Sequence, residues 1–326
     1  MLLLATLEQF DIQPADFFIV IATIGLVLYI TLAALCAPLV SVLTEMGYAI
    51  RKKAFLDKCA MQMAQSALVN AIFIMFALAA GAWLIISQTQ PELLEPPIPW
   101  RPVVFFSPAF AAVCLLLLYT GTWQLLKKAR PLHVLLGLLA ALLFLAVLFL
   151  GSLLAANVQQ PSFFSVLFDD PLTVLQALLG DFLTTPPMWA MVGYLFCAGV
   201  AFGMALAQIW LMLRRSRADY GRDYYAFAMQ YCARIALVFT VLATGLVGAV
   251  YWLLRQTTPP ELSQPHDPGI LLIAAGLPLC CCLLWIVIAK SSMPMRHKPG
   301  AVFAFLFSYV ALCAQMLMLM TTFPLI

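Results

Sequence analysis

Long apolar stretches alternate with short polar connections along the whole chain. A helix needs about 20 apolar residues to cross about 30 Å of hydrocarbon, and eight nearly uncharged stretches reach that length. They cover approximately residues 17–43, 59–87, 104–126, 133–157, 187–213, 226–254, 269–289 and 301–322. The pattern predicts an all-α integral membrane protein with eight transmembrane helices.

The composition agrees with this pattern and excludes two other classes. Of the 326 residues, 64% are hydrophobic and only 10% are charged, and the mean hydropathy is +1.02. A soluble domain carries about a quarter charged residues, so the chain is not a soluble enzyme. Its net charge of +3 provides no continuous positive face, which excludes a strongly basic nucleic-acid binder.

The connections differ in charge from one side of the predicted membrane to the other. The short connections hold 14 of the 17 basic residues, and the Pro-rich connections and the N-terminal segment hold 10 of the 14 acidic residues. Basic connections face the cytoplasm in multi-pass proteins. We therefore expect a bacterial cytoplasmic (inner) membrane protein with its N-terminus and C-terminus on the periplasmic side.

The longest outer connection, at about 158–186, divides the chain into two halves. It contains an amphipathic segment that predicts an interfacial helix on the outer surface. Each half begins its second helix with an Ala-Met-Gln triplet, at residues 60–62 and 228–230, after a basic connection. We predict a 4+4 parallel repeat. Residues 1–160 form one four-helix bundle with an N-terminal interfacial segment, and residues 161–326 form the outer helix and a second bundle.

The histidines and cysteines give no sign of a metal or a haem. His133, His266 and His297 lie at the ends of predicted spans or in connections, so no pair is placed to hold a b-type haem within the membrane. No CxxCH segment occurs. The nine cysteines lie in or beside the spans, where packing explains them. We therefore expect no haem or metal on this chain.

Uncharged polar side chains within the spans are the candidate ligand-binding groups. Gln62, Gln65 and Asn70 recur at helical spacing on one face of the second span. Hydrogen bonds between helices are one interpretation of this face. Quinone is the other, since its carbonyls need a few donors and its tail needs lipid access. Arg234, the deepest charge, extends to the cytoplasmic interface, binds an anionic head group or pairs with a carboxylate such as Glu45. The candidate quinone-binding residues are Asp16, Gln62, Gln65, Asn70, Tyr119, Trp189, Gln230, Arg234 and His266.

Two short resemblances involve the opening helices of the two halves. Trp189 is followed by Tyr194, Leu195, Phe196, Ala198, Gly199 and Gly203. This helix resembles the opening helix of the polysulfide-reductase and nitrite-reductase membrane-subunit (NrfD-like) family. The resemblance implies two four-helix bundles, no haem, a quinone site near the outer face and redox partner subunits. The first two spans resemble the start of cytochrome bd subunit I, without its haem-ligand histidine.

These observations lead to one functional expectation and two alternatives. We expect the membrane anchor subunit of a respiratory electron-transfer complex, which binds menaquinone or ubiquinone. Its partners would be iron–sulfur subunits, multihaem cytochrome c subunits, or both, together with lipid. It would be a subunit without a resident metal or haem in a quinone-linked oxidoreductase complex, with no catalytic residue of its own. The alternatives are a transporter or channel for an uncharged or lipid-like solute, and a purely structural membrane subunit.

Overall fold

The computed structural model is built from helices in the part of the chain that it describes. The described residues are 14–89, 100–157, 176, 179–180, 182, 184–216, 220–257 and 268–322. The long helices are α2 (Pro14–Arg51), α3 (Ala54–Thr89), α4 (Trp100–Gly121), α5 (Arg130–Asn157), α8 (Pro186–Arg214), α9 (Arg222–Thr257), α10 (Pro268–Lys290) and α11 (Lys298–Thr322). Two short 3-10 helices, η2 (Leu125–Lys127) and η3 (Pro294–His297), lie in connections.

Seven of the described helices are long and apolar enough to cross a membrane. The helix of the predicted third span, α4, contributes a shorter apolar segment, Ser107–Gly121. Large apolar side chains, among them Phe76, Leu125 and Leu272, are exposed on the outer surface of the molecule. Such a surface is stable against lipid and not against water. The chain is therefore an all-α, multi-pass membrane protein, and the eighth crossing stays a prediction.

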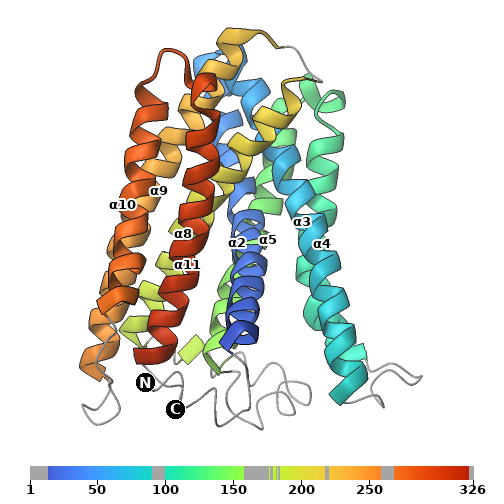
Figure 1. Cartoon of the computed structure of the whole chain (residues 1–326). Helices are drawn as coiled ribbons and strands as arrows, with labels where there is room; N and C mark the ends of the chain where they lie inside the picture. Colours follow the sequence, from blue (N-terminus) through green and yellow to red (C-terminus); the bar gives the residue numbers. More distant parts are fainter. Residues whose placement is uncertain are drawn as a thin grey trace.

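The helices run up and down between two ends of the molecule (Figure 1). The helices α2, α4, α8 and α10 finish at one end, where the basic connections lie, and this end is called the basic end below. The first described residue, Pro14, and the last helical residue, Thr322, lie at the opposite end. The predicted side of the membrane on which the termini lie stays a prediction.

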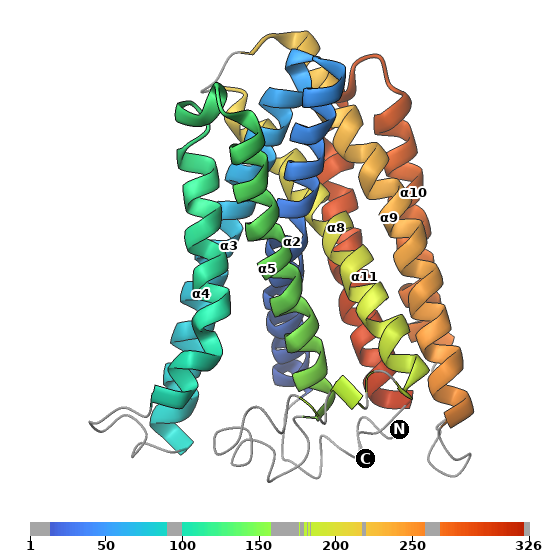
Figure 2. The same ribbon diagram turned by 180° about the vertical axis from the view of Figure 1, so that it is seen from behind.

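The central helices α2 and α8 are packed against each other and connect the two groups of helices. On one side α3, α4 and α5 complete a group with α2, and on the other α9, α10 and α11 complete a group with α8 (Figure 2). Neighbouring helices within each group contact one another. The first group is called the α2–α5 bundle below and the second the α8–α11 bundle.

Glycines bring the backbones of α2 and α8 close together. A methyl group added at Gly199 would lie 2.5 Å from Cys36 Sγ and 2.7 Å from the Leu32 carbonyl oxygen. One added at Gly203 would lie 3.0 Å from Ala37 Cβ. Gly199 and Gly203 are four residues apart and so share one face of α8. Small residues at this spacing allow close helix contact in a membrane, so the two bundles are joined tightly at their centre.

The observed helices extend or shorten several of the predicted spans. The predicted first span ended at residue 43, but α2 continues to Arg51 and includes Glu45 as an interior residue. The predicted third span continued to residue 126, but α4 ends at Gly121, where a residue without a side chain weakens the helix. The predicted N-terminal interfacial segment and most of the outer interfacial helix lie outside the described residues.

Candidate functional site

Buried polar side chains are unevenly distributed between the two ends of the molecule. Those toward the basic end are Ser41, Thr44, Glu45, Gln62, Ser66, His133 and Gln208. Thr240 lies near the middle of α9, and Gln315 lies in the half of α11 toward the opposite end. A buried polar group inside a membrane is costly unless it has a partner or a function.

A buried carboxylate joins three helices of the α2–α5 bundle. Glu45 of α2 is 1% exposed. The hydroxyl of Tyr119 in α4 donates a hydrogen bond to Glu45 Oε2 at 2.8 Å. On α5, His133 Nδ1 lies 2.8 Å from Glu45 Oε1, and Arg130 Nε lies 3.5 Å from the same oxygen. Glu45, Tyr119, Arg130 and His133 are called the Glu45 cluster below.

The second contact of the imidazole determines where its protons lie. His133 Nε2 is 2.9 Å from the Tyr119 carbonyl oxygen, which can only accept, so Nε2 carries a hydrogen. Two states then satisfy the contact between Nδ1 and Glu45. Either a charged imidazolium donates to the carboxylate, or a protonated Glu45 donates to a neutral imidazole. The contact therefore holds one proton that either residue can carry.

Aromatic rings and a second carboxylate enclose the Glu45 cluster. The Tyr119 ring stacks on the His133 ring with centroids 4.5 Å apart, and Trp123 meets the imidazole edge-on at 4.7 Å. Arg130 also forms an ion pair with Asp57 at the start of α3. Arg130 and Asp57 are partly exposed, unlike Glu45 and His133. The cluster thus connects a buried proton site to the surface at the basic end.

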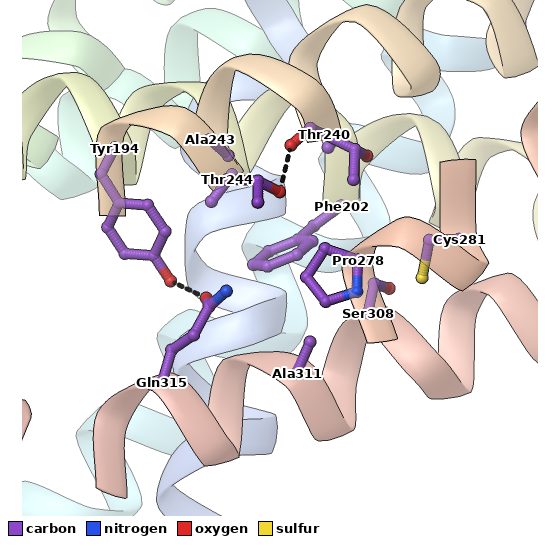
Figure 3. A pocket seen from close by; sticks show the side chains of 12 residues that line it. Tyr194, Phe202, Thr240, Ala243, Thr244, Pro278, Cys281, Ser308, Ala311 and Gln315 are labelled. Atoms are coloured by element: carbon purple, nitrogen blue, oxygen red, sulfur yellow. Dashed lines mark hydrogen bonds between the residues drawn. The ribbon is translucent and has the colours of Figure 1, made fainter. Parts of the chain in front are cut away.

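The α8–α11 bundle holds a small, mainly apolar cavity with several polar groups in its lining (Figure 3). Its volume is about 30 Å³, which is room for about one water molecule. Residues from all four helices line it: Tyr194, Ala198, Ala201, Phe202, Thr240, Ala243, Thr244, Pro278, Cys281, Ser308, Ala311 and Gln315. The lining combines hydroxyl and amide groups with alanines and two aromatic rings, and a space of this size holds a water molecule.

A proline in α10 explains the amide at one side of this cavity. Pro278 has no N–H, so the carbonyl of Ala274, four residues earlier, loses its helical partner. Gln315 Nε2 donates to that carbonyl at 3.1 Å. Gln315 Oε1 accepts in turn from the Tyr194 hydroxyl at 2.6 Å, as Figure 3 shows. Gln315 therefore connects α8, α10 and α11.

Replacing Gln315 with leucine should lower the free energy of unfolding by about 1–3 kcal/mol, because buried partners lose their hydrogen bonds. The Ala274 carbonyl and the Tyr194 hydroxyl would both be left unpaired. Unfolding in detergent, followed by circular dichroism, measures the change. Gln256→Leu is the matched control, since Gln256 is exposed at the end of α9. Equal stability of the two variants would contradict this explanation of Gln315.

Two polar side chains near this cavity have no hydrogen-bond partner among the described residues. They are Gln208, at both Oε1 and Nε2, and Trp285, at Nε1. Gln208 is 0% exposed and Trp285 is 1% exposed. Each lies seven residues, or about two helical turns, from a cavity-lining residue, Ala201 on α8 and Pro278 on α10. Both thus occupy the cavity-facing sides of their helices, nearer the basic end.

The predicted quinone-binding residues are distributed over several places in the structure. Tyr119 lies in the Glu45 cluster. Gln62 is buried with its Oε1 unpaired among the described residues, while Gln65 Oε1 accepts from Arg214 at 3.2 Å. Asn70 is half-buried on α3. The structure does not bring these residues into one site.

Of the remaining predicted residues, Gln230 is part-buried, Trp189 and Arg234 are exposed, and two are not described in full. Gln230 Nε2 donates to the Ser291 carbonyl at 2.7 Å. Trp189 is exposed and packs on Phe182. Arg234 is exposed on α9, whereas Glu45 pairs with residues of α4 and α5, so the alternative of an Arg234–Glu45 pair is wrong. The side chain of Asp16 and the whole of His266 lie outside the described residues.

The sequence interpretation missed the residues that the structure singles out. Glu45 and His133 are 88 positions apart, and each looked like an ordinary helix-end residue. Arg130 and His133 share one face of α5, a spacing that was available as a signal. Gln208 and Trp285 gave none, because only packing shows that an amide or an indole is unpaired. Within the described residues, no group of three or more metal-ligating side chains occurs.

The fold defines a polytopic, all-helical membrane protein in its described part. It has a buried contact between Glu45 and His133 and two buried side chains, Gln208 and Trp285, without a partner among the described residues. No protein-family model, curated protein or solved structure matches the chain. The function is therefore argued from the geometry of these regions.

Proposed function

We propose that this chain is the quinone-binding membrane subunit of a respiratory electron-transfer complex. The observation that carries the proposal is the pair of buried side chains, Gln208 and Trp285, that have no hydrogen-bond partner among the described residues. They lie on α8 and α10, about two helical turns from lining residues of the α8–α11 cavity. An unpaired buried amide costs about 1–3 kcal/mol, so a ligand or water that satisfies it is the physical explanation.

The hydrogen-bonding chemistry of these groups matches a quinone headgroup. Because the cavity has room for about one water molecule, the helices of the α8–α11 bundle would have to separate to admit it. Gln208 Nε2 and Trp285 Nε1 are neutral donors, which suit the carbonyl oxygens of a quinone. Gln208 Oε1 is an acceptor, which suits the hydroxyl of a quinol. Ala198, Ala201 and Phe202 add apolar surface at the cavity. A bound quinone would supply redox chemistry that takes up or releases protons together with electrons.

The Glu45 cluster is the proposed proton-exchange group for this chemistry. Glu45 and His133 share a hydrogen bond at 2.8 Å, and Arg130 and Asp57 connect this contact to the basic end. Thr44, next to Glu45, lies 3.0 Å from the Tyr231 hydroxyl of α9, oxygen to oxygen. The cluster therefore borders the α8–α11 bundle, in which the quinone is proposed to bind.

The proposal includes partner subunits and an orientation in the membrane. Electrons would come from or go to extrinsic iron–sulfur or multihaem cytochrome c subunits, since we expect no metal on this chain. An eight-span, 4+4 arrangement in a bacterial inner membrane would place both termini on the periplasmic side, because the basic connections are expected in the cytoplasm. The contacts within each group of four helices support two bundles.

The double variant Gln208→Leu, Trp285→Phe tests the quinone site. We expect the quinone retained by the purified protein to fall about tenfold or more, since two hydrogen bonds are lost. The stability of the quinone-free protein should stay equal or rise, because the variant removes unpaired buried polar groups. Extraction and mass spectrometry measure the quinone, and unfolding in detergent measures the stability.

Gln256→Leu is the matched control for this experiment. It removes an exposed amide at the end of α9 that lies away from the basic end. Unchanged quinone content in the double variant would overturn the proposed site. A loss of stability without a change in quinone content would instead assign Gln208 to packing. Movement of an uncharged solute by the pure protein in liposomes, with no bound quinone, would support the transporter alternative.

A further inference from the structure

A second and larger cavity lies at the basic end, outside the regions described so far. Its volume is about 270 Å³. Three arginines line it: Arg215 directly after α8, Arg222 at the first position of α9, and Arg296 in η3. Ser292 and Met293, from the connection after α10, are also part of its lining. Positive charges from three separate segments thus converge on one space.

These arginines have no carboxylate partner in the described part of the chain. The ion pairs there involve Arg130 and His133 with Glu45 and Asp57, and no acidic residue is among the described residues that line the cavity. Three like charges around one space repel one another. Guanidinium groups bind phosphate oxygens through paired, charge-assisted hydrogen bonds, so a phosphate-bearing anion would remove the repulsion.

The connection that carries part of the cavity wall is held in place by hydrogen bonds. Gln230 Nε2 fixes the Ser291 carbonyl to α9 at 2.7 Å. The backbone N–H of Met293 donates to Ser291 Oγ at 3.1 Å, and that of Arg296 donates to the Met293 carbonyl at 2.9 Å. The wall is therefore formed before a ligand arrives, which lowers the entropic cost of binding.

We propose that this cavity binds a phosphate-bearing anion, and that its source is the headgroup of an anionic phospholipid. The choice of a lipid rests on the apolar neighbours of the arginines. Met293 in the cavity wall is 36% exposed, and Met295 also lines the cavity. Exposed apolar side chains beside a phosphate site offer contact for acyl chains, which a free phosphate ion does not need.

The double variant Arg222→Gln, Arg296→Gln tests this site in lipid nanodiscs of phosphatidylglycerol and phosphatidylcholine. Native mass spectrometry counts the phosphatidylglycerol molecules that stay bound to the released protein. We expect wild-type protein to retain phosphatidylglycerol preferentially, and the variant to bind it roughly thirtyfold more weakly. Lys127→Gln, Lys128→Gln is the matched control, since it removes two exposed charges from the same end and lies in another connection.

Each outcome of this experiment decides for or against the lipid site. An unchanged control together with a weakened cavity variant supports it. Equal weakening of both variants would show a general charge effect and overturn it. Calorimetry with inorganic phosphate, in nanodiscs of phosphatidylcholine alone, is the second arm. Tight phosphate binding without a preference for phosphatidylglycerol would overturn the lipid as the source. The amount of bound quinone should be the same in the wild type and in both variants. The lipid proposal and the quinone proposal are therefore tested separately.

Discussion

Replacing Gly199 with alanine should lower the free energy of unfolding by about 1–3 kcal/mol, or more, because it overpacks a closed contact. The new methyl group would lie 2.5 Å from Cys36 Sγ and 2.7 Å from the Leu32 carbonyl oxygen. The sulfur can shift a little, but the carbonyl belongs to the backbone of α2 and cannot move without bending that helix. The contact between the two bundles would have to open.

Gly248→Ala is the matched control for this prediction. Gly248 also lies inside a long helix, α9, but no atom lies within 4 Å of the position of an added methyl group. Alanine there should be neutral or stabilising, because it favours the helix. Adding Cys36→Ala to Gly199→Ala should restore part of the lost stability. Unfolding in detergent, measured for all three variants, checks the prediction, and equal stability of Gly199→Ala and Gly248→Ala would contradict it.

The difference between these two glycines shows what the sequence can and cannot predict about the fold. The apolar stretches predicted the ends of the long helices within five residues, except that α2 continues eight residues beyond residue 43. This agreement is possible because the length of a span is a local property. Which face of α8 contacts α2 depends instead on residues that are far apart in the sequence. Gly199 and Gly248 both occur in small-residue patches, and only the packing of the helices shows that one is in contact and the other is open.

The same limit applies to the candidate sites. Glu45 and Tyr119 are separated by 74 positions, so nothing in either neighbourhood indicates that they meet. Pro278 was visible in the sequence, and its missing N–H implies a free carbonyl at Ala274. That Gln315 supplies the donor follows only from the packing of α11 against α10. Partners fixed by long-range packing were therefore beyond the sequence, whereas the charge difference between the connections was readable from it.

The basic end and the outer surface of the helices differ in polarity, and each suits one requirement of the proposed quinone reaction. Toward the basic end, buried groups that can carry a proton or donate a hydrogen bond occur in both bundles. The surface around the helices is apolar. A quinone reaches its protein through lipid, while its protons must come from water. The proposed function needs both lipid access and a supply of protons. A variant of the Glu45 cluster tests the proton supply separately from quinone binding.

Replacing Glu45 with glutamine should lower quinol turnover by the intact complex about 100-fold or more, the usual effect of losing a positioned acid or base. The amide preserves the geometry, because its oxygen accepts from Tyr119 and its nitrogen donates to a neutral His133. The shared proton is lost, together with the ion pair between Glu45 and Arg130 Nε. Bound quinone should therefore stay unchanged, and the pH dependence of the residual turnover should flatten. Turnover assays and quinone extraction on the same preparation measure these effects.

Two further variants separate this role from a structural one. Glu45→Leu should cost about 3–5 kcal/mol of stability, because it leaves buried Tyr119 and His133 without their acceptor. Asp223→Asn, which changes an exposed carboxylate at the basic end of α9, should leave turnover and stability unchanged. If folded Glu45→Gln protein keeps wild-type turnover with the same pH dependence, the cluster carries no proton in the reaction. Its pairing would then serve only to hold α2, α4 and α5 together.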